Sequence, residues 1–313
     1  MQHCNRFYFS NSFFRRLFIF YLLLIIPTTI FSQDTTSFFQ KSDTLNKIRR
    51  NAVYISEAVG ASIALTALNQ LWYADYDRSN FHFINDNSSW MQMDKFGHVF
   101  SSYYIGKMGM DALDWAGESK KNQLLYGATT GWVFLTAVEI LDGHSEKWGF
   151  STGDILANTL GTGLLIGQEL LWDEQRIQLK FSFQTSEYAE LNPGKLGENT
   201  IQQIFKDYNG QTYWFSFNIW SFFKESNFPK WLNIAVGYGA DGLLNGTPDS
   251  NIPPKTNDTY KQFLTSIDVD LTKIKTNSPF LKTVFNVFNF VKIPAPAIEY
   301  RGNGDIKFHA LHF

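Results

Sequence analysis

The hydrophobic and polar positions change their period about halfway along the chain. From residue 51 to about 175, Ala, Leu, Gly and Met predominate in long segments with few internal breakers. From residue 176, aromatic and polar residues alternate between Asn, Gly and Pro clusters. The first pattern is typical of helices and the second of strands. The sequence therefore predicts an α+β fold, with an antiparallel bundle of about four helices over 51–175 and an antiparallel strand-rich region over 176–313.

Four helices of similar length are predicted in the first half, over 52–73, 93–115, 121–142 and 152–173. A length of about twenty residues would cross a hydrocarbon core of about 30 Å, but it also suits an ordinary bundle. Two pairs of small residues favour close helix packing and are frequent in membrane bundles, namely Gly127 with Gly131 and Gly163 with Gly167. Charged residues on the same helices oppose full contact with lipid. Both embedded or membrane-apposed helices and a water-soluble bundle remain open.

Strands are predicted in the second half over 177–183, 213–219, 232–238 and 263–271. The dipeptide Asn303-Gly304 is predicted to close a hairpin between Ala297–Tyr300 and Ile306–Phe313. Residues 279–291 are predicted to form one late amphipathic helix. The chain ends in Phe313, but counting back by twos gives Leu311 and then His309, so an outward apolar stripe ends after two positions.

The amino terminus has the pattern of a secretion signal. Arg15 and Arg16 precede an apolar run from Leu17 to Ile26, Pro27 ends that run, and a small residue, Ser32, lies just before Gln33. We predict a cleaved signal peptide over residues 1–32, followed by a polar tether over 33–50. An uncleaved anchor is the alternative, although ten apolar residues are fewer than the about 20 that span a bilayer.

Composition narrows the classes of partner. The only cysteine, Cys4, lies before the apolar run, so the mature chain would have no thiol for a disulfide, a metal ligand or a lipid anchor. Removing the three arginines of the signal leaves 24 of the 27 basic residues against 29 acidic ones, and no basic tract suggests nucleic acid. An aromatic content of 17% favours membrane lipid or envelope proteins as partners.

Polar residues gather at three predicted helix ends. Because short connections make consecutive helices antiparallel, the start of the second helix, the end of the third and the start of the fourth should converge. The residues concerned are Asp94, Lys95, His98, Glu139, Asp142, Ser151, Asp154 and Asn158. Together they could hold a divalent metal at His98, Glu139, Asp142 and Asp154, or perform acid–base chemistry.

A purely structural interpretation of the same residues stays open. Asp94 suits the positive end of a helix dipole, and Ser151 with Asp154 forms a variant of the capping box. Asp142 lies in the last turn of its helix, where the dipole disfavours a carboxylate, so it requires a compensating cation such as Lys95, His98 or a metal. The alternative to a functional site is a buried polar network that fixes helix register.

The spacing of these residues is similar to that of a known family. Asp94-Lys95-x-x-His98, Glu139-x-x-Asp142 and Ser151-x-x-Asp154-x-x-x-Asn158 resemble the YfiM-like family of predicted envelope lipoproteins of unknown function, over about residues 50 to 175. They are more distantly similar to VanZ-like membrane domains, and later stretches resemble a Bacteroidetes form. The resemblance implies a site at these positions, but no reaction, substrate or cofactor.

Two functional classes follow from these observations. The first is an exported, membrane-associated envelope protein, in the periplasm or at the outer membrane, that acts as a non-enzymatic scaffold or binding protein. The second is a metal-dependent or acid–base enzyme that acts on an envelope component through the Asp/His/Glu cluster. The aromatic content favours the first class, and only the converging cluster favours the second.

Overall fold

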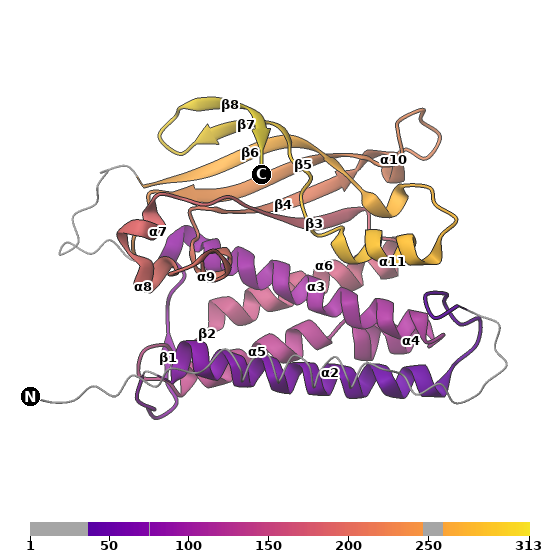
Figure 1. Ribbon diagram of the computed structural model, residues 1–313, viewed down its shortest axis with the longest axis horizontal. Helices are drawn as coiled ribbons and strands as arrows, with labels where there is room; N and C mark the ends of the chain where they lie inside the picture. Colours follow the sequence, from indigo (N-terminus) through magenta and orange to yellow (C-terminus); the bar gives the residue numbers. More distant parts are fainter. Residues whose placement is uncertain (1–36, 75, 247–258) are drawn as a thin grey trace, which may run out of the picture. The chain divides into compact units, whose positions relative to one another are not determined.

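The computed structural model describes residues 37–74, 76–246 and 259–313. The predicted signal peptide and the first residues of the predicted tether lie outside the described residues. Phe38–Phe313 forms one unit, in which a layer of helices lies beside a sheet of six strands (Figure 1). The predicted α+β fold with a strand-rich carboxyl-terminal region is confirmed.

The helical layer contains four long helices. They are α2 (Lys47–Leu68), α3 (Met93–Trp115), α5 (Thr130–Gly143) and α6 (Thr152–Trp172). A π-helical turn at Asn69–Tyr73 continues α2, while the short helix α4 (Lys120–Asn122) and a π-helical turn at Gln123–Gly127 precede α5. The second helix has the predicted bounds, whereas the third is interrupted before Thr130.

The described part of the predicted tether is attached to the helices. The Asn46 side chain accepts hydrogen bonds from the amides of Ile48 and Arg49, so α2 begins at Lys47 rather than at residue 52. The Trp115 indole donates to the carbonyl of Phe38 at 2.6 Å, at the end of α3. These residues are therefore part of the folded unit and not a free linker.

Glycines allow α5 to approach α3 closely. A Cβ at Gly131 would lie 2.1 Å from the carbonyl oxygen of Ser102, and one at Gly127 would lie 2.6 Å from the Cα of Met110. Both distances are far below van der Waals contact, so this predicted pair of small residues is confirmed as a packing surface.

The second predicted pair of small residues does not pack. A Cβ at Gly163 or Gly167 would meet nothing within 4 Å, because both residues lie on the outward side of α6. Gly161 makes the close approach instead, since its added Cβ would lie 2.2 Å from the carbonyl oxygen of Val99. The sequence pattern identified the correct helix but the wrong face.

The second half forms a six-stranded antiparallel meander in sequence order. Its strands are β3 (Ile177–Phe183), β4 (Gln211–Asn218), β5 (Leu232–Asp241), β6 (Tyr260–Val269), β7 (Ala295–Arg301) and β8 (Ile306–His312). The connections contain short helices α7 (Tyr188–Leu191), α8 (Pro193–Leu196), α9 (Thr200–Lys206) and α10 (Ile219–Phe222), a 3-10 turn at Leu271–Lys273, and the longer helix α11 (Pro279–Phe288). The predicted hairpin at Asn303-Gly304 is confirmed, and Gly304 adopts a φ of 98° there.

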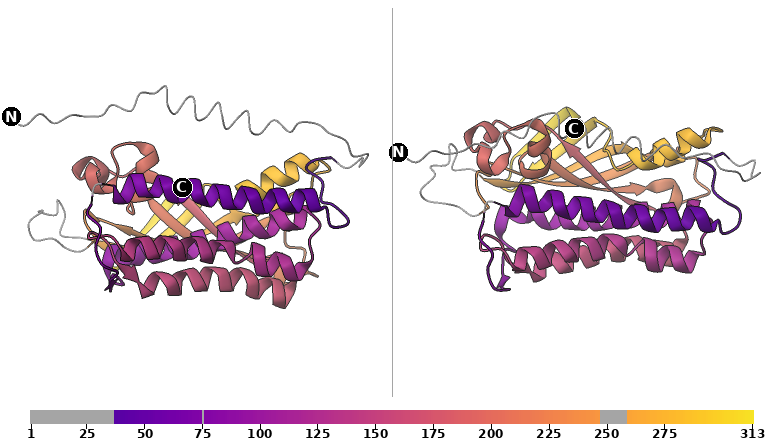
Figure 2. Two further views of the ribbon diagram at one scale, coloured as in Figure 1. Left: turned by 90° about the horizontal axis from the view of Figure 1, so that it is seen from below. Right: turned by 60° about the horizontal axis from the view of Figure 1, so that its bottom comes forward.

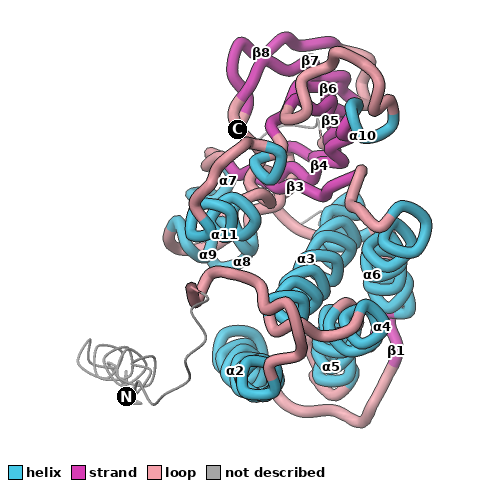
Figure 3. Tube along the Cα trace, turned by 90° about the vertical axis from the view of Figure 1, so that its right-hand side faces the viewer, coloured by secondary structure: helices cyan, strands magenta, loops and turns pink. Residues whose placement is uncertain are grey.

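The sheet is curled (Figure 3). Its inner face is largely polar and its outer face is apolar. His312 on β8 contacts the ring of Trp214 on β4, at 5.7 Å between ring centroids. Inside the curl, the fully buried Lys180 forms an ion pair with Asp268 at 3.1 Å. Helix α3 covers the outer face over the first strands, where Phe100 contacts the rings of Phe181 and Tyr213, and it reaches β5 where Phe96 stacks on Tyr238 at 4.4 Å. Elsewhere on β5–β8 the outer face has exposed apolar residues, namely Ile234, Val236, Phe263, Ile267, Ile298 and Phe308.

A β-bulge explains why the stripe counted from the carboxyl terminus ended early. His309 pairs with Ala297 while His312 pairs with Ala295, so β8 has one extra residue between these pairs. Both histidines consequently face inward, whereas Leu311 and Phe313 are exposed. The outward apolar stripe of β8 therefore continues across the bulge, which a strict period of two cannot reveal.

Candidate functional site

Three helix ends converge as the sequence predicted. The starts of α3 and α6 and the end of α5 lie at the end of the helical layer where β1 (Phe83–Ile84) pairs in parallel with β2 (Phe150–Ser151) (Figure 1). His98 Nε2 lies 3.7 Å from Glu139 Oε1, and Glu139 is only 2% exposed. Residues from three helices thus meet in one buried cluster.

Lys95 is the positive centre of this cluster. Its ammonium lies 2.7 Å from Asp86, 3.1 Å from Asp94 and 2.8 Å from Asp154. Burial opposes the charge of this lysine, but the neighbouring carboxylates, Asp94 foremost, outweigh burial and raise its pKa. Lys95 is therefore a permanent cation shared by three acids.

Asp86 and Tyr208 are members of the cluster that the sequence analysis missed. Ser151 Oγ donates to Asp86 at 2.6 Å, and the pairing of Ile84 with Ser151 brings the two residues together. The Tyr208 hydroxyl donates to Asp94 at 3.1 Å from the strand-rich half. Neither residue belongs to a helical pattern, so only the pairing of β1 with β2 and the docking of the two halves could have revealed them.

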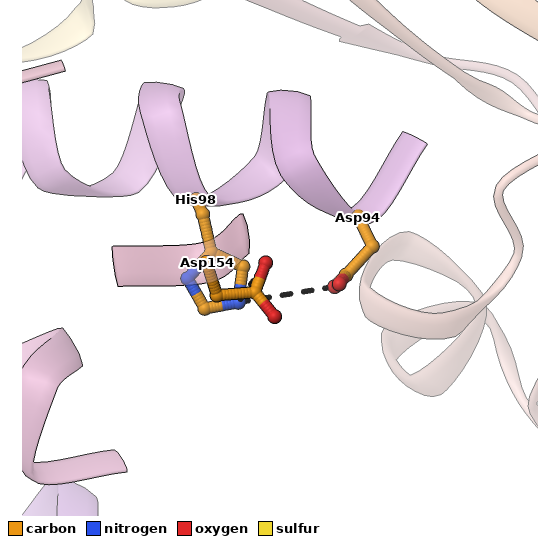
Figure 4. Close-up of side chains that lie close together, drawn as sticks. All are labelled: Asp94, His98 and Asp154. Carbon is orange, nitrogen blue, oxygen red and sulfur yellow. Dashed lines mark ion pairs between the residues drawn. The ribbon is translucent and has the colours of Figure 1, made fainter. Parts of the chain in front are cut away.

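His98 is held by one nitrogen and faces carboxylates with the other. Its Nδ1 lies 3.0 Å from the amide oxygen of Asn158, which can only accept, so Nδ1 carries the donated proton. Nε2 lies 3.9 Å from Asp94 and 3.7 Å from Asp154. Figure 4 shows these three side chains close together. Burial lowers the pKa of His98, but the negative charges of Asp94, Asp154 and Glu139 outweigh burial and raise the pKa overall.

Two buried carboxyl groups of the cluster have strongly raised pKa values. Burial raises the pKa of Glu139 to about 8, although His98 and the amide of Ser151, which donates at 3.0 Å, partly offset it. Burial and the charge of Asp94 raise the pKa of Asp154 to about 6. The Ser151 side chain also caps α6 by accepting from the amide of Asp154 at 3.2 Å, as the sequence predicted.

Asp142 differs from the prediction, because the partner that compensates it is not a cation. The hydroxyl of Tyr73, in the π-helical turn after α2, donates to Asp142 at 2.6 Å. Among the described residues, no Lys, Arg or His lies within ion-pair distance of Asp142. Burial raises its pKa to about 7, so protonation and a neutral donor replace the expected ion pair.

The backbone that leads into the cluster is strained. Trp90, Met91 and Gln92 have φ values of 50°, 52° and 66°, in the left-handed region that non-glycine residues rarely adopt. The strand-rich half holds this segment, since the Tyr238 hydroxyl donates to the carbonyl of Met91 and Lys261 donates to the Gln92 side chain at 2.7 Å. Asp94 and Lys95 follow this segment after one residue, Met93.

One family model matches the segment of the chain that contains most of the cluster. Residues 82–167 match the family model DUF2279, described as a predicted periplasmic lipoprotein. No curated protein and no solved structure was found to match the chain. The matched segment contains every cluster residue except Tyr208, and its description agrees with an exported, envelope-associated protein. The family supplies no reaction.

Proposed function

We propose that the protein is a non-enzymatic envelope protein that attaches to a membrane through the outward face of α2, α5 and α6 and binds or scaffolds other envelope components there. The observation that carries this proposal is the absence of exposed charge on this face. Among the described residues of 51–68, 124–141 and 155–171, no charged side chain is exposed. The three helices lie side by side in the views of Figures 2 and 3.

Helix α2 shows this property most clearly. Val53 is its only buried residue, whereas Ile55, Val59 and Ile63 are 47–65% exposed. On α6, Leu156, Leu160, Leu170 and Leu171 are exposed in the same manner. Apolar surface of this extent is costly in water and is stabilised by contact with lipid.

Charged residues flank this face. Lys47, Arg49 and Arg50 begin α2, and Lys120 and Lys121 begin α4 at the same end of the layer (Figure 1). Cations at such a position favour contact with anionic lipid headgroups. Two described helical segments, Lys47–Leu68 and Lys120–Gly143, are also long and apolar enough to cross a membrane, a criterion that a helix lying against a membrane meets equally well.

Flotation with lipid vesicles tests the attachment and its location. The purified protein should float with vesicles of phosphatidylethanolamine and phosphatidylglycerol. The double variant Ile55→Glu, Val59→Glu should reduce the bound fraction by about tenfold, because binding scales with buried apolar area. The matched control is Ile298→Glu, Phe308→Glu on the outer face of the sheet, where both residues are exposed.

The control also shows how the proposal can fail. If the helix variant still floats and the sheet variant does not, the sheet provides the lipid contact and the proposed face is wrong. If neither variant changes flotation, or if the unaltered protein stays in the soluble fraction, the membrane proposal is wrong as a whole.

An enzyme that uses the cluster is the second candidate, favoured by the contact of His98 with Glu139 at 3.7 Å. Acid–base chemistry requires groups that exchange protons near neutral pH, and the pKa of Glu139 is raised to about 8. In a deletion strain with a measurable envelope defect, Glu139→Gln should then fail to restore the phenotype even though vesicle binding is unchanged. Full complementation by this variant excludes the enzyme.

A further inference from the structure

We propose that the cluster binds one Zn²⁺ ion. The four ligands are His98 Nε2 and one oxygen each from Asp94, Glu139 and Asp154. This inference does not depend on attachment to a membrane. It rests on the positions of the four ligand atoms, on the partners that hold them, and on an oxygen of Asp154 that lacks a hydrogen bond.

Asp94, His98 and Asp154 have the mutual spacing of metal ligands, and Glu139 joins them through its short distance to His98. His98 Nε2 lies 3.7–3.9 Å from an oxygen of each of the three carboxylates, which is too long for hydrogen bonds. Ligand atoms of Asp94, His98 and Asp154 all lie within 4.8 Å of one another (Figure 4). In a tetrahedral zinc site with metal–ligand distances of about 2.0–2.2 Å, ligand atoms lie about 3.4 Å apart, so each of the three distances from His98 Nε2 exceeds this spacing by about half an ångström or less.

One oxygen of Asp154 faces this space. Asp154 is 3% exposed, and Lys95 donates its hydrogen bond to Oδ2 at 2.9 Å, so Oδ1 has only the ion pair with the same ammonium, 2.8 Å away, among the residues that the structure describes. The same Oδ1 is the atom that lies 3.7 Å from His98 Nε2. A carboxylate oxygen has two lone pairs, so Oδ1 can bind a metal ion in addition to this ion pair.

Neighbouring residues form hydrogen bonds to the ligand side chains and orient them, as is usual for metal ligands in proteins. The Nδ1–H of His98 donates to Asn158 Oδ1 at 3.0 Å, which leaves Nε2 directed at the carboxylates. Lys95 donates to Oδ2 of Asp94 at 3.1 Å, while Oδ1 of that residue faces His98. The second oxygen of Glu139 accepts from the amide of Ser151 at 3.0 Å.

The chemistry of these donors selects the metal. One imidazole and three carboxylates suit zinc and similar divalent ions better than Mg²⁺ or Ca²⁺, which prefer oxygen ligands alone. Asp86 is the third carboxylate beside Lys95, after Asp94 and Asp154, so acidic groups outnumber basic ones in the cluster and a divalent cation reduces the imbalance. Asp142 is not one of the four ligands, because it has no ion pair with His98 among the described residues and accepts the hydroxyl of Tyr73 at 2.6 Å.

Calorimetric titration of the purified exported protein with ZnCl₂, after treatment with a chelator, tests the site. We expect one Zn²⁺ per chain and no comparable binding of Mg²⁺. His98→Gln and Asp94→Asn should each weaken binding by at least about 100-fold, because each removes a ligand. Asn158→Ala should weaken binding by about 10- to 100-fold, because it removes the hydrogen bond that orients the His98 imidazole without removing a ligand.

Two matched controls address general effects on the fold. Asp142→Asn changes a half-buried carboxylate at the end of α5 that also holds Glu139, and His309→Gln changes a histidine that contacts Glu299 at 2.6 Å in the sheet. Both should leave zinc binding unchanged. Circular dichroism establishes that each variant is folded, and X-ray absorption at the zinc edge should show nitrogen and oxygen ligands.

Two results would overturn the proposal. One is no zinc binding tighter than about 0.1 mM by the unaltered protein. The other is unchanged zinc binding by folded His98→Gln and Asp94→Asn, which would locate the ion elsewhere. Vesicle flotation is measured separately, so failure of the zinc site leaves the membrane proposal intact, and the reverse also holds.

Discussion

Glu139→Gln should change how the stability of the protein depends on pH. Glu139 is 2% exposed, and burial raises its pKa from 4.5 to about 8. Because the folded state binds the proton more tightly than the unfolded state, the contribution of Glu139 is fully present below about pH 4.5 and is lost as the pH rises through 8. The displacement of about 3.5 pKa units corresponds to an upper bound of about 5 kcal/mol, at 1.36 kcal/mol per unit.

Glutamine cannot ionise, but its side-chain oxygen can still accept the hydrogen bond from the amide of Ser151. The variant should therefore resemble the unaltered protein at pH 5 and exceed it by a few kcal/mol at pH 8.5. His98, Asp154 and Asp142 also have raised pKa values, so they reduce stability in the same direction as pH rises. The difference between the two proteins isolates the part due to Glu139.

Denaturant unfolding followed by circular dichroism, in one detergent and with a chelator present, measures this difference at pH 5, 6.5 and 8.5. The chelator is needed because a bound cation would favour the ionised form of Glu139. Parallel stability curves for the two proteins would show that Glu139 ionises normally in the folded state. The burial argument would then be wrong.

Two further changes test the packing of the helices, with the same unfolding assay. Lys95→Met should cost about 3–5 kcal/mol, because it leaves three carboxylates without their shared ammonium, whereas the exposed Lys121→Met should stay within about 0.5 kcal/mol. Gly131→Ala should cost about 1–3 kcal/mol, because its Cβ would lie 2.1 Å from a carbonyl oxygen, whereas Gly163→Ala meets nothing within 4 Å and should stabilise by up to about 1 kcal/mol. Equal effects within either pair would contradict the packing described above.

The sequence predicted most of the regular structure because local signals determine it. The second helix, 93–115, and the first strand, 177–183, have the predicted bounds, since periodicity and turn residues mark their ends. The convergence of His98 with Glu139 was also predictable, because short connections force neighbouring helices to run antiparallel. These features depend on residues close together in the chain.

Contacts between distant segments were not predictable in the same way. Asp86 reaches Lys95 through a two-residue parallel pairing, which has no signature in a single sequence. Tyr73 satisfies Asp142 from a π-helical turn, where an ordinary α-helix would direct the side chain elsewhere. The bulge in β8 likewise moves Leu311 to the outer face, and no rule of alternation anticipates it.

The strained segment before α3 shows why the strand-rich half matters to the cluster. Three consecutive residues in the left-handed region cost about 1–3 kcal/mol each, so they persist only where surrounding contacts hold them. Those contacts come from Tyr238 on β5 and Lys261 on β6, which lie outside the segment that matches DUF2279. Asp94 and Lys95 lie in the first turn of α3, which starts where this strained segment ends. The sheet therefore fixes the position of that turn. The helices supply most side chains of the cluster, and the sheet determines the positions of Asp94 and Lys95.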